Sequence, residues 1–309
     1  MMQKKSIWAV LFVMLLMALS VNGAVAEDDA LRSGDYQYRV LEDGTAEITH
    51  YFGRDSVVHI PDTLDGKTVT SIRDVAFAWC SSLTTIELPD SVTSMGVNPF
   101  AGCKSLKNIQ VSPEQPVFAV IDGVLFNKAE KSLICYPDGK QEEAYEVPQG
   151  IQQIKSGAFS CCSSLTTIEL PDSVTSIGES AFSDCSTLTT IELPDGVTSI
   201  GEHAFSDCSS LTSIELPDSV TSIGEYAFYD CSSLTTIELP DSVTSIGEYA
   251  FYRCRSLTSI ELPDSVTSIG ESAFAWCRSL TSIELPDGVT NIGDQAFWGC
   301  NNLTVTILQ

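Results

Sequence analysis

Basic side chains are scarce in this sequence of 309 residues, which carries 16 lysines and arginines against 41 aspartates and glutamates. Affinity for nucleic acids and for anionic lipid surfaces comes mainly from lysine and arginine. The formal net charge of −25 therefore excludes nucleic acid as a partner and favours solubility, cations and basic proteins. The hydrophobic content of 43% is too high for a disordered acidic tail, so these charges decorate a folded protein.

Long apolar runs are absent beyond the first residues. The run from Ile7 to Leu19 has 13 residues, fewer than the ~20 that a membrane-spanning helix needs. Two lysines precede this run, and an Ala-Val-Ala cleavage site ending at Ala26 follows it. We expect residues 1–26 to be a secretory signal peptide cleaved after Ala26, rather than an uncleaved anchor. The mature chain then has no transmembrane segment, and its expected location is extracellular or at the cell surface.

Signatures of metal binding and of catalysis are also missing. No Cys-x-x-Cys pair occurs, and His50, His59 and His203 are scattered, so the sequence predicts no metal site. There is no Gly-x-Ser-x-Gly motif for a nucleophilic serine. Carboxylates that recur in identical settings have no reason to differ in pKa, as an acid and base pair must. We therefore expect no catalytic residues, no cofactor and no enzymatic activity.

The sequence is instead rich in a 23-residue repeat. Its template reads Cys-x-x-Leu-x-x-Ile-x-Leu-Pro-Asp-x-Val-Thr-x-Ile-Gly-x-x-Ala-Phe-x-x-Cys, and a period of this size predicts a solenoid. The Leu-x-x-Ile-x-Leu-Pro part predicts a short strand ended by proline, which cannot donate to the ladder. Val-Thr-x-Ile-Gly predicts a second strand, and Glu-x-x-Ala-Phe-x-x-Cys a single helical turn. Seven cysteines mark the period: Cys162, Cys185, Cys208, Cys231, Cys254, Cys277 and Cys300.

The template resembles the BspA-type leucine-rich repeat, known from surface proteins like that of Treponema pallidum. The resemblance covers Leu83 to Cys103 and Ile151 to Cys300, with ten template positions kept in register. It implies a leucine-rich-repeat solenoid, mostly β with short helical turns. It also implies a secreted or surface-displayed protein that adheres to a protein ligand on a host or a neighbouring cell.

The repeat divides the chain into parts. Residues 27–82 are expected to form an N-terminal β cap and a first partial repeat. Strands at 36–40 and 46–51 form its hairpin around Asp43 and Gly44, with a third strand at 57–60. Residues 83–309 are expected to form the solenoid, with strands paired in sequence order. An insert at about 104–150 breaks the period, and we expect it to be a hairpin that bulges from one side.

Eleven cysteines in an exported chain raise the question of disulfides. Stacked repeats bring equivalent cysteines close enough for a bridge between neighbours. The odd count and the fixed offset from Ala-Phe instead favour buried, reduced thiols that act as small core residues. The adjacent pair Cys161 and Cys162, and the unpaired Cys135, are predicted to be the most reactive.

Two surfaces are candidates for function. The sheet face carries one exposed carboxylate per repeat, which predicts attraction for cations and weak calcium binding, or simply a solvated face. This acidic ladder consists of Glu169, Glu192, Glu215, Glu238, Glu261 and Glu284. The convex, helical-turn side gathers the aromatic and arginine residues that are enriched at binding hot spots, unless the rings only cover the back of the solenoid. These partner-binding candidates are Tyr226, Tyr229, Tyr249, Tyr252, Arg253, Arg255, Trp276, Arg278 and Trp298.

We therefore expect a secreted or cell-surface adhesion protein. One alternative is a cation-dependent carbohydrate-binding module, for which stacked rings and acids would serve. Another is a passive structural spacer in a surface assembly. The sequence leaves the ligand, the anchoring mode and the oligomeric state open.

Overall fold

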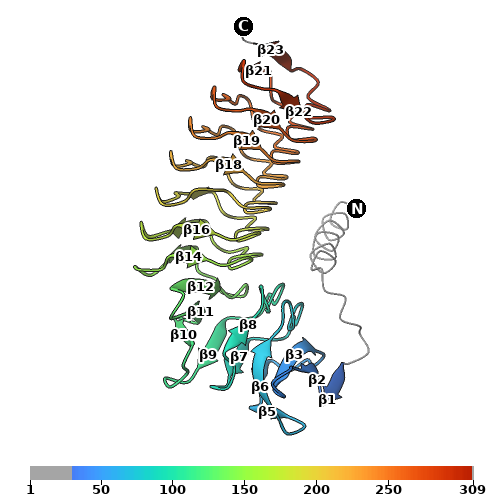
Figure 1. Cartoon of the computed structure of the whole chain (residues 1–309), viewed down its shortest axis with the longest axis vertical. Coiled ribbons are helices and arrows are strands. Elements are labelled where there is room, and N and C mark those ends of the chain that lie inside the picture. The colour runs from blue at the N-terminus through green and yellow to red at the C-terminus, as the bar shows by residue number, and fades with distance from the viewer. Residues whose placement is uncertain (1–29, 308–309) are drawn as a thin grey trace.

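The computed structural model describes residues 30–307 of the chain, so the expected signal peptide lies outside the described residues. Strands and turns form one stack of rungs that follow each other in sequence order, from the blue N-terminal sheet to the red C-terminal end (Figure 1). Rungs are joined by parallel pairing between residues 23 apart, such as Ser222 with Ser245 and Ser245 with Ser268. The predicted leucine-rich-repeat solenoid is confirmed.

The N-terminal end is an antiparallel sheet, in which β1 (Leu31–Ser33) pairs with β2 (Tyr36–Val40) and β2 with β3 (Ala46–Tyr51). Gly44 adopts a φ of +83° in the turn between β2 and β3, a left-handed conformation that glycine enters at little cost. The edge of this sheet then becomes part of the solenoid. Strand β3 pairs in parallel with β6 (Lys67–Ile72), against which β5 (Thr63–Leu64) pairs in antiparallel fashion.

Two rows of short parallel strands build the solenoid. The first row, from the Leu-x-x-Ile-x-Leu segments, contains β4 (Val57–His59), β7 (Thr85–Leu88), β9 (Asn108–Val111), β13 (Ala144–Glu146), β15 (Thr167–Glu169), β17 (Thr190–Ile191), β21 (Ser282–Leu285) and β23 (Thr304–Ile307). The second row, from the Val-Thr-x-Ile segments, contains β3, β6, β8 (Ser94–Met95), β12 (Ser132–Cys135), β14 (Gln153–Ile154), β16 (Ser176–Ile177), β18 (Ser222–Ile223), β19 (Ser245–Ile246), β20 (Ser268–Ile269) and β22 (Asn291–Ile292).

Parallel pairing begins before the expected start at Leu83. Val58 of β4 already pairs with Ile86 of β7, and Ile48 of β3 pairs with Ile72 of β6. These apolar residues are buried and take the places of the two template isoleucines, and parts of the template recur here, as in Val58-x-Ile60-Pro61-Asp62 and in 69–80. The rungs therefore extend into residues 27–82, for which the sequence indicated a cap and a first partial repeat.

The Glu-x-x-Ala-Phe-x-x-Cys segments are not helical turns, contrary to the prediction. In residues 178–185, the N–H groups of Ala181 and Cys185 donate to carbonyls three residues back. The N–H groups of Ser180, Phe182 and Asp184 donate instead to carbonyls of the next rung. Ser180 and Asp184 have φ values of +55° and +58°, and with this backbone alternate N–H groups point away from their own segment, toward the next rung. Hydrogen bonds between rungs compensate for this strained backbone and replace those of a helix.

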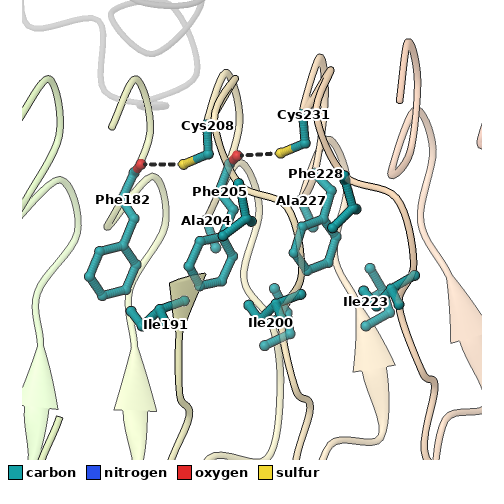
Figure 2. Close-up of a cluster of buried hydrophobic side chains, with 14 of the residues drawn as sticks. Phe182, Ile191, Ile200, Ala204, Phe205, Cys208, Ile223, Ala227, Phe228 and Cys231 are labelled. Atoms are coloured by element: carbon teal, nitrogen blue, oxygen red, sulfur yellow. Dashed lines mark hydrogen bonds between the residues drawn. The ribbon is translucent and has the colours of Figure 1, made fainter. Parts of the chain in front are cut away.

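The core is a ladder of identical side chains in successive rungs (Figure 2). Ring centroids of Phe182 and Phe205 lie 5.1 Å apart, those of Phe205 and Phe228 lie 5.5 Å apart, and the rings are nearly parallel. The template cysteines from Cys185 to Cys300 each donate the thiol proton to a phenylalanine carbonyl of the preceding rung, as Cys208 does to Phe182 at 3.1 Å. Stacking at this spacing buries the rings from Phe159 to Phe274 completely, so the core is continuous along these rungs.

We expected the insert to bulge from one side of the solenoid, and the structure shows that it does not. Strands β10 (Phe118–Ile121) and β11 (Val124–Asn127) form the hairpin, and β11 pairs with β12 in antiparallel fashion. Leu125 is buried in the core on the N-terminal side, whereas Val124 and Phe126 are buried in the core on the C-terminal side. The hairpin thus fills a place in the stack, because its apolar side chains face both neighbouring cores.

The fold changes the expected order of thiol reactivity. Cys135 and Cys162 are 3% and 2% exposed, and burial raises the pKa of both thiols. Burial also raises the pKa of the Cys161 thiol to about 12. These three cysteines are therefore poor nucleophiles, since the thiolate is the reactive form. Cys80 and Cys300, near the two ends of the ladder, are partly buried like Cys161, but hydrogen bonding with the neighbouring cysteines Cys103 and Cys277 lowers the pKa of their thiols.

We expect a thiol reagent to label Cys80 and Cys300 first in the folded protein, with the buried thiols labelled only after unfolding. Mass mapping of the labelled peptides would give the order. Denaturation without reductant should then release most of the eleven cysteines as free thiols. Recovery of only one or two free thiols would show instead that neighbouring rungs are bridged by disulfides.

Candidate interaction site

The acidic ladder runs along the first strand row as a column of exposed carboxylates. Direct backbone bridges join Glu192 to Glu215, Glu215 to Glu238, and Glu238 to Glu261. Each step has the same neighbours, so the column supplies negative charge without a distinctive shape. Within the described part of the chain, no group of three or more histidine, cysteine or acidic side chains is arranged to hold a metal ion. Weak calcium binding along this column stays a prediction.

The aromatic candidates on the turn side stack into two columns. In the first, ring centroids of His203 and Tyr226 lie 4.6 Å apart, and those of Tyr226 and Tyr249 lie 4.8 Å apart. In the second, Tyr229 and Tyr252 are 5.1 Å apart and nearly parallel. Edge contacts join the columns, because Tyr226 lies 5.7 Å from Tyr229. The 23-residue period places these rings at equivalent positions, so the four tyrosines form one continuous surface.

The arginines extend this surface toward the C-terminus. The guanidinium of Arg253 lies 5.3 Å from the ring centroid of Tyr252, and that of Arg278 lies 5.1 Å from that of Trp276. Such contacts hold a cation against an aromatic face at a modest energy, about 0.5–1 kcal/mol when exposed. Arg253, Trp276, Arg278 and Arg255 line one open hollow, which we call the arginine hollow.

Trp298 is the one partner-binding candidate that lies outside both the tyrosine columns and the arginine hollow. Its side chain is 59% exposed on the last turn and does not line the arginine hollow. Its carbonyl accepts a hydrogen bond of 2.6 Å from the Trp276 backbone N–H, so the two residues occupy adjacent rungs. The tyrosine columns, the arginine hollow and Trp298 therefore form a strip along the turn side, which we call the turn-side strip.

Two residues that contact these side chains, His203 and Asp230, were not among the candidates named from the sequence. His203 continues the first aromatic column, and burial lowers its pKa to about 4, so its ring is neutral at pH 7. Asp230 lies 3.6 Å from Arg253 and 3.8 Å from Arg255, measured between carboxylate oxygen and guanidinium nitrogen. The signal was present, since the residue before each template cysteine forms one column that holds Asp184, Asp207, Asp230 and Arg253 in turn.

Two aspartates of this column, Asp184 and Asp207, which directly precede template cysteines, have raised pKa values. Burial and the neighbouring Asp184 raise the pKa of Asp207 to about 7, although Arg253 acts in the opposite direction. Burial likewise raises the pKa of Asp184. The folded state therefore binds a proton on Asp207 more tightly than the unfolded chain, in which the group titrates near 3.8. This contribution to stability is complete below pH 4 and is lost as the pH rises through 7.

We expect the wild-type protein to melt at a higher temperature at pH 6 than at pH 8. Asp207→Asn should reduce this difference and stabilise the protein at pH 8 by roughly 1–2 kcal/mol, a discounted value because the side chain is partly exposed. Asparagine also tolerates the left-handed φ of +59° at this position. Calorimetry at both pH values tests this, with Asp218→Asn in an exposed turn as the control. An unchanged pH dependence in Asp207→Asn would contradict the assignment.

The stack of 23-residue rungs, with ladders of leucine, isoleucine and phenylalanine inside, defines a leucine-rich-repeat scaffold, a class that serves contacts between proteins. The chain belongs to the family of BspA type leucine-rich repeat regions, which its residues 58–132, 135–254 and 199–309 match in six copies. The family resemblance predicted from the template is confirmed.

Two solved structures, from Eubacterium ventriosum and from a pneumococcus, agree with this fold. A leucine-rich repeat protein from Eubacterium ventriosum is similar with a TM-score of 0.64 and 19% identity, covering 90% of this chain and 94% of that one. The pneumococcal vaccine antigen PcpA is similar with a TM-score of 0.61 and 22% identity, covering 84% of this chain and 69% of that one. A leucine-rich repeat protein of T. pallidum is 30% identical, covering 74% of this chain and 90% of that one, with a TM-score of 0.41.

No curated protein matches the chain. Within residues 30–307, the structure contains no helix that is long and apolar enough to cross a bilayer.

Proposed function

We propose that this protein is exported and acts at the cell surface or outside the cell as an adhesion protein, which binds a protein on a host or a neighbouring cell through the turn-side strip. The repeat family supports an interaction scaffold. The signal-peptide pattern of residues 1–26 supports export. No enzymatic activity belongs to this proposal.

The observation that carries the choice of surface is the concentration of distinct groups on the turn side. Among the four tyrosines, each ring centroid lies within 6 Å of two others, and the arginine hollow continues this group. Interface energy concentrates in aromatic and arginine anchors of this kind. Stacked rings also lose little conformational freedom on binding, because their neighbours already hold them in place. The uniform acidic ladder offers no comparable set of groups.

We expect the combined variant Tyr229→Ser, Tyr252→Ser and Trp276→Asn to bind at least tenfold more weakly. Serine already occupies the places equivalent to the two tyrosines at Ser183 and Ser206, so the fold tolerates it. Asparagine suits the left-handed φ of +64° at Trp276. Surface plasmon resonance against a panel of immobilised extracellular-matrix proteins would measure the loss, with circular dichroism as the check on folding.

The matched control is Glu215→Gln, Glu238→Gln and Glu261→Gln on the acidic ladder. If this variant loses binding and the turn-side variant keeps it, the sheet face is the interaction site. Two other functions remain as outcomes of related measurements. Binding on a glycan array that depends on calcium would favour a carbohydrate-binding module. Failure to retain any protein from matrix or cell-surface fractions would favour a structural spacer.

A further inference from the structure

The arginine hollow concentrates all the cationic charge of its half of the molecule. Lys155 is the last lysine, and Arg253, Arg255 and Arg278 are the only lysines or arginines beyond it. The three preceding rungs carry aspartate at the place of Arg253, and the four preceding rungs carry serine at the place shared by Arg255 and Arg278. Two adjacent rungs thus replace the repeated pattern with arginine, and all three guanidinium groups line the same hollow.

The charges of this hollow are not balanced within the protein. Asp230 is shared between Arg253 and Arg255, at 3.6 Å and 3.8 Å, which is longer than a hydrogen bond. Among residues 30–307, no carboxylate lies within 4.0 Å of the Arg278 guanidinium. Three cations against one anion leave a local formal charge of 3 − 1 = +2. The guanidinium groups therefore keep donors free for an incoming anion.

The shape and chemistry of the hollow indicate which anion fits. Guanidinium groups present forked pairs of N–H donors that match the two oxygens of a carboxylate. Trp276 forms an apolar wall, and Arg278 lies over its ring. A carboxylate attached to an aliphatic or aromatic group would thus meet both surfaces at once.

The surroundings exclude a long polyanion. Residues 156–309 carry 21 acidic side chains against the three arginines, a formal charge of 3 − 21 = −18. A sulfated polysaccharide or nucleic acid that reached the hollow would also lie along this acidic surface and be repelled. A single carboxylate on a basic protein segment meets attraction both in the hollow, through its own charge, and around it, through the charge of the segment.

We propose that the arginine hollow binds one carboxylate, from an acidic side chain or a chain end, presented beside an apolar residue within a basic segment of a partner protein. This inference rests on the proposed binding function and specifies the group that anchors the partner. Arg255 and Arg278 bind the carboxylate, Trp276 contacts the apolar neighbour, and Asp230 holds Arg253 and Arg255 at the rim of the hollow.

Isothermal titration of the full chain with three acetylated peptides tests the proposal. All three contain four lysines around one phenylalanine. The first has glutamate beside the phenylalanine and an amidated end, the second has glutamine there and a free carboxyl end, and the third has glutamine and an amidated end. We expect the first or the second to bind at least tenfold more tightly than the third, and their comparison distinguishes a side chain from a chain end.

The gain in affinity that a carboxylate gives a peptide should be lost in the double variant Arg255→Gln and Arg278→Gln. Both arginine side chains are exposed in the wild type, so the fold tolerates the change. The Glu215→Gln variant should keep the gain. Equal binding of all three peptides would overturn the proposal, as would an unchanged gain in the arginine variant, or binding of heparin in place of the peptides. If the arginine variant still binds the matrix protein that the aromatic variant loses, this inference fails and the proposed function stands. If the carboxylate peptides bind while no matrix protein does, the proposed carboxylate site is supported and the proposed adhesion to a host protein is contradicted.

Discussion

Replacing Phe228 with alanine is expected to lower the free energy of unfolding by about 3–5 kcal/mol. The ring is fully buried, and its centroid lies 5.5 Å from that of Phe205 and 5.3 Å from that of Phe251. Backbone hydrogen bonds fix the spacing of the rungs on both sides, as the Phe228 N–H donating to Ala250 at 2.8 Å illustrates. The cavity therefore cannot collapse, and most of the lost contact area stays lost.

Urea denaturation would measure this loss, and amide hydrogen exchange would locate it. Each rung of a solenoid contacts only its neighbours, so exchange should accelerate most in the rungs around residue 228. Tyr229→Ser is the matched control, because it removes the adjacent aromatic ring from the surface side. A loss below 1 kcal/mol in Phe228→Ala, or equal losses in both variants, would contradict a rigid ladder.

Gly247→Ala is expected to destabilise the protein by about 3 kcal/mol or more, toward the upper end of overpacking effects. A Cβ at this position would lie 2.6 Å from the Gly224 carbonyl carbon and 2.7 Å from the Glu225 nitrogen. Both are backbone atoms, which cannot rotate away as a side chain would. Relief requires the two rungs to separate, which stretches the 2.9 Å hydrogen bond from the Gly247 N–H to the Ile223 carbonyl.

Gly201→Ala provides an internal control at the equivalent position of another rung. The nearest atom to a Cβ there is the Ile177 carbonyl oxygen at 3.5 Å, an ordinary contact. Alanine also reduces the conformational freedom of the unfolded chain, which offsets small losses. We expect the Gly201 variant to melt within a few degrees of the wild type. Similar melting temperatures for both alanine variants would show that the approach between rungs is not limiting.

The ladders were predictable because they depend only on the period. Once Phe205 and Phe228 are 23 residues apart at the same template position, stacking follows from the solenoid itself. The same reasoning placed Tyr229 beside Tyr252, and the structure confirms that contact at 5.1 Å. Residues that depart from the template cannot be placed in this way, which is why the hairpin at 118–127 was assigned to a bulge.

The turn segments show a different limit. Ala, Phe and Cys recur at helical spacing, but spacing does not tell whether the N–H of Phe182 bonds within its own rung or to the next one. Residues with positive φ, such as Ser180 and Asp184, decide that question; serine does not signal it in the sequence, and aspartate is only a weak signal. The pairing of Asp230 with two arginines was missed for a related reason, because it joins neighbouring columns as well as neighbouring rungs.

The hydrogen bonds between rungs run along the length of the stack, and this direction has a mechanical consequence. A pulling force applied to the two ends would load one rung interface after another in series, so the weakest end rung would peel away first. Each released rung would feed out 23 residues, or about 75 Å of extended chain. Under tension the regular repeats would thus lengthen in equal steps, which force spectroscopy records directly, and each rung that is still folded keeps its own part of the turn-side strip.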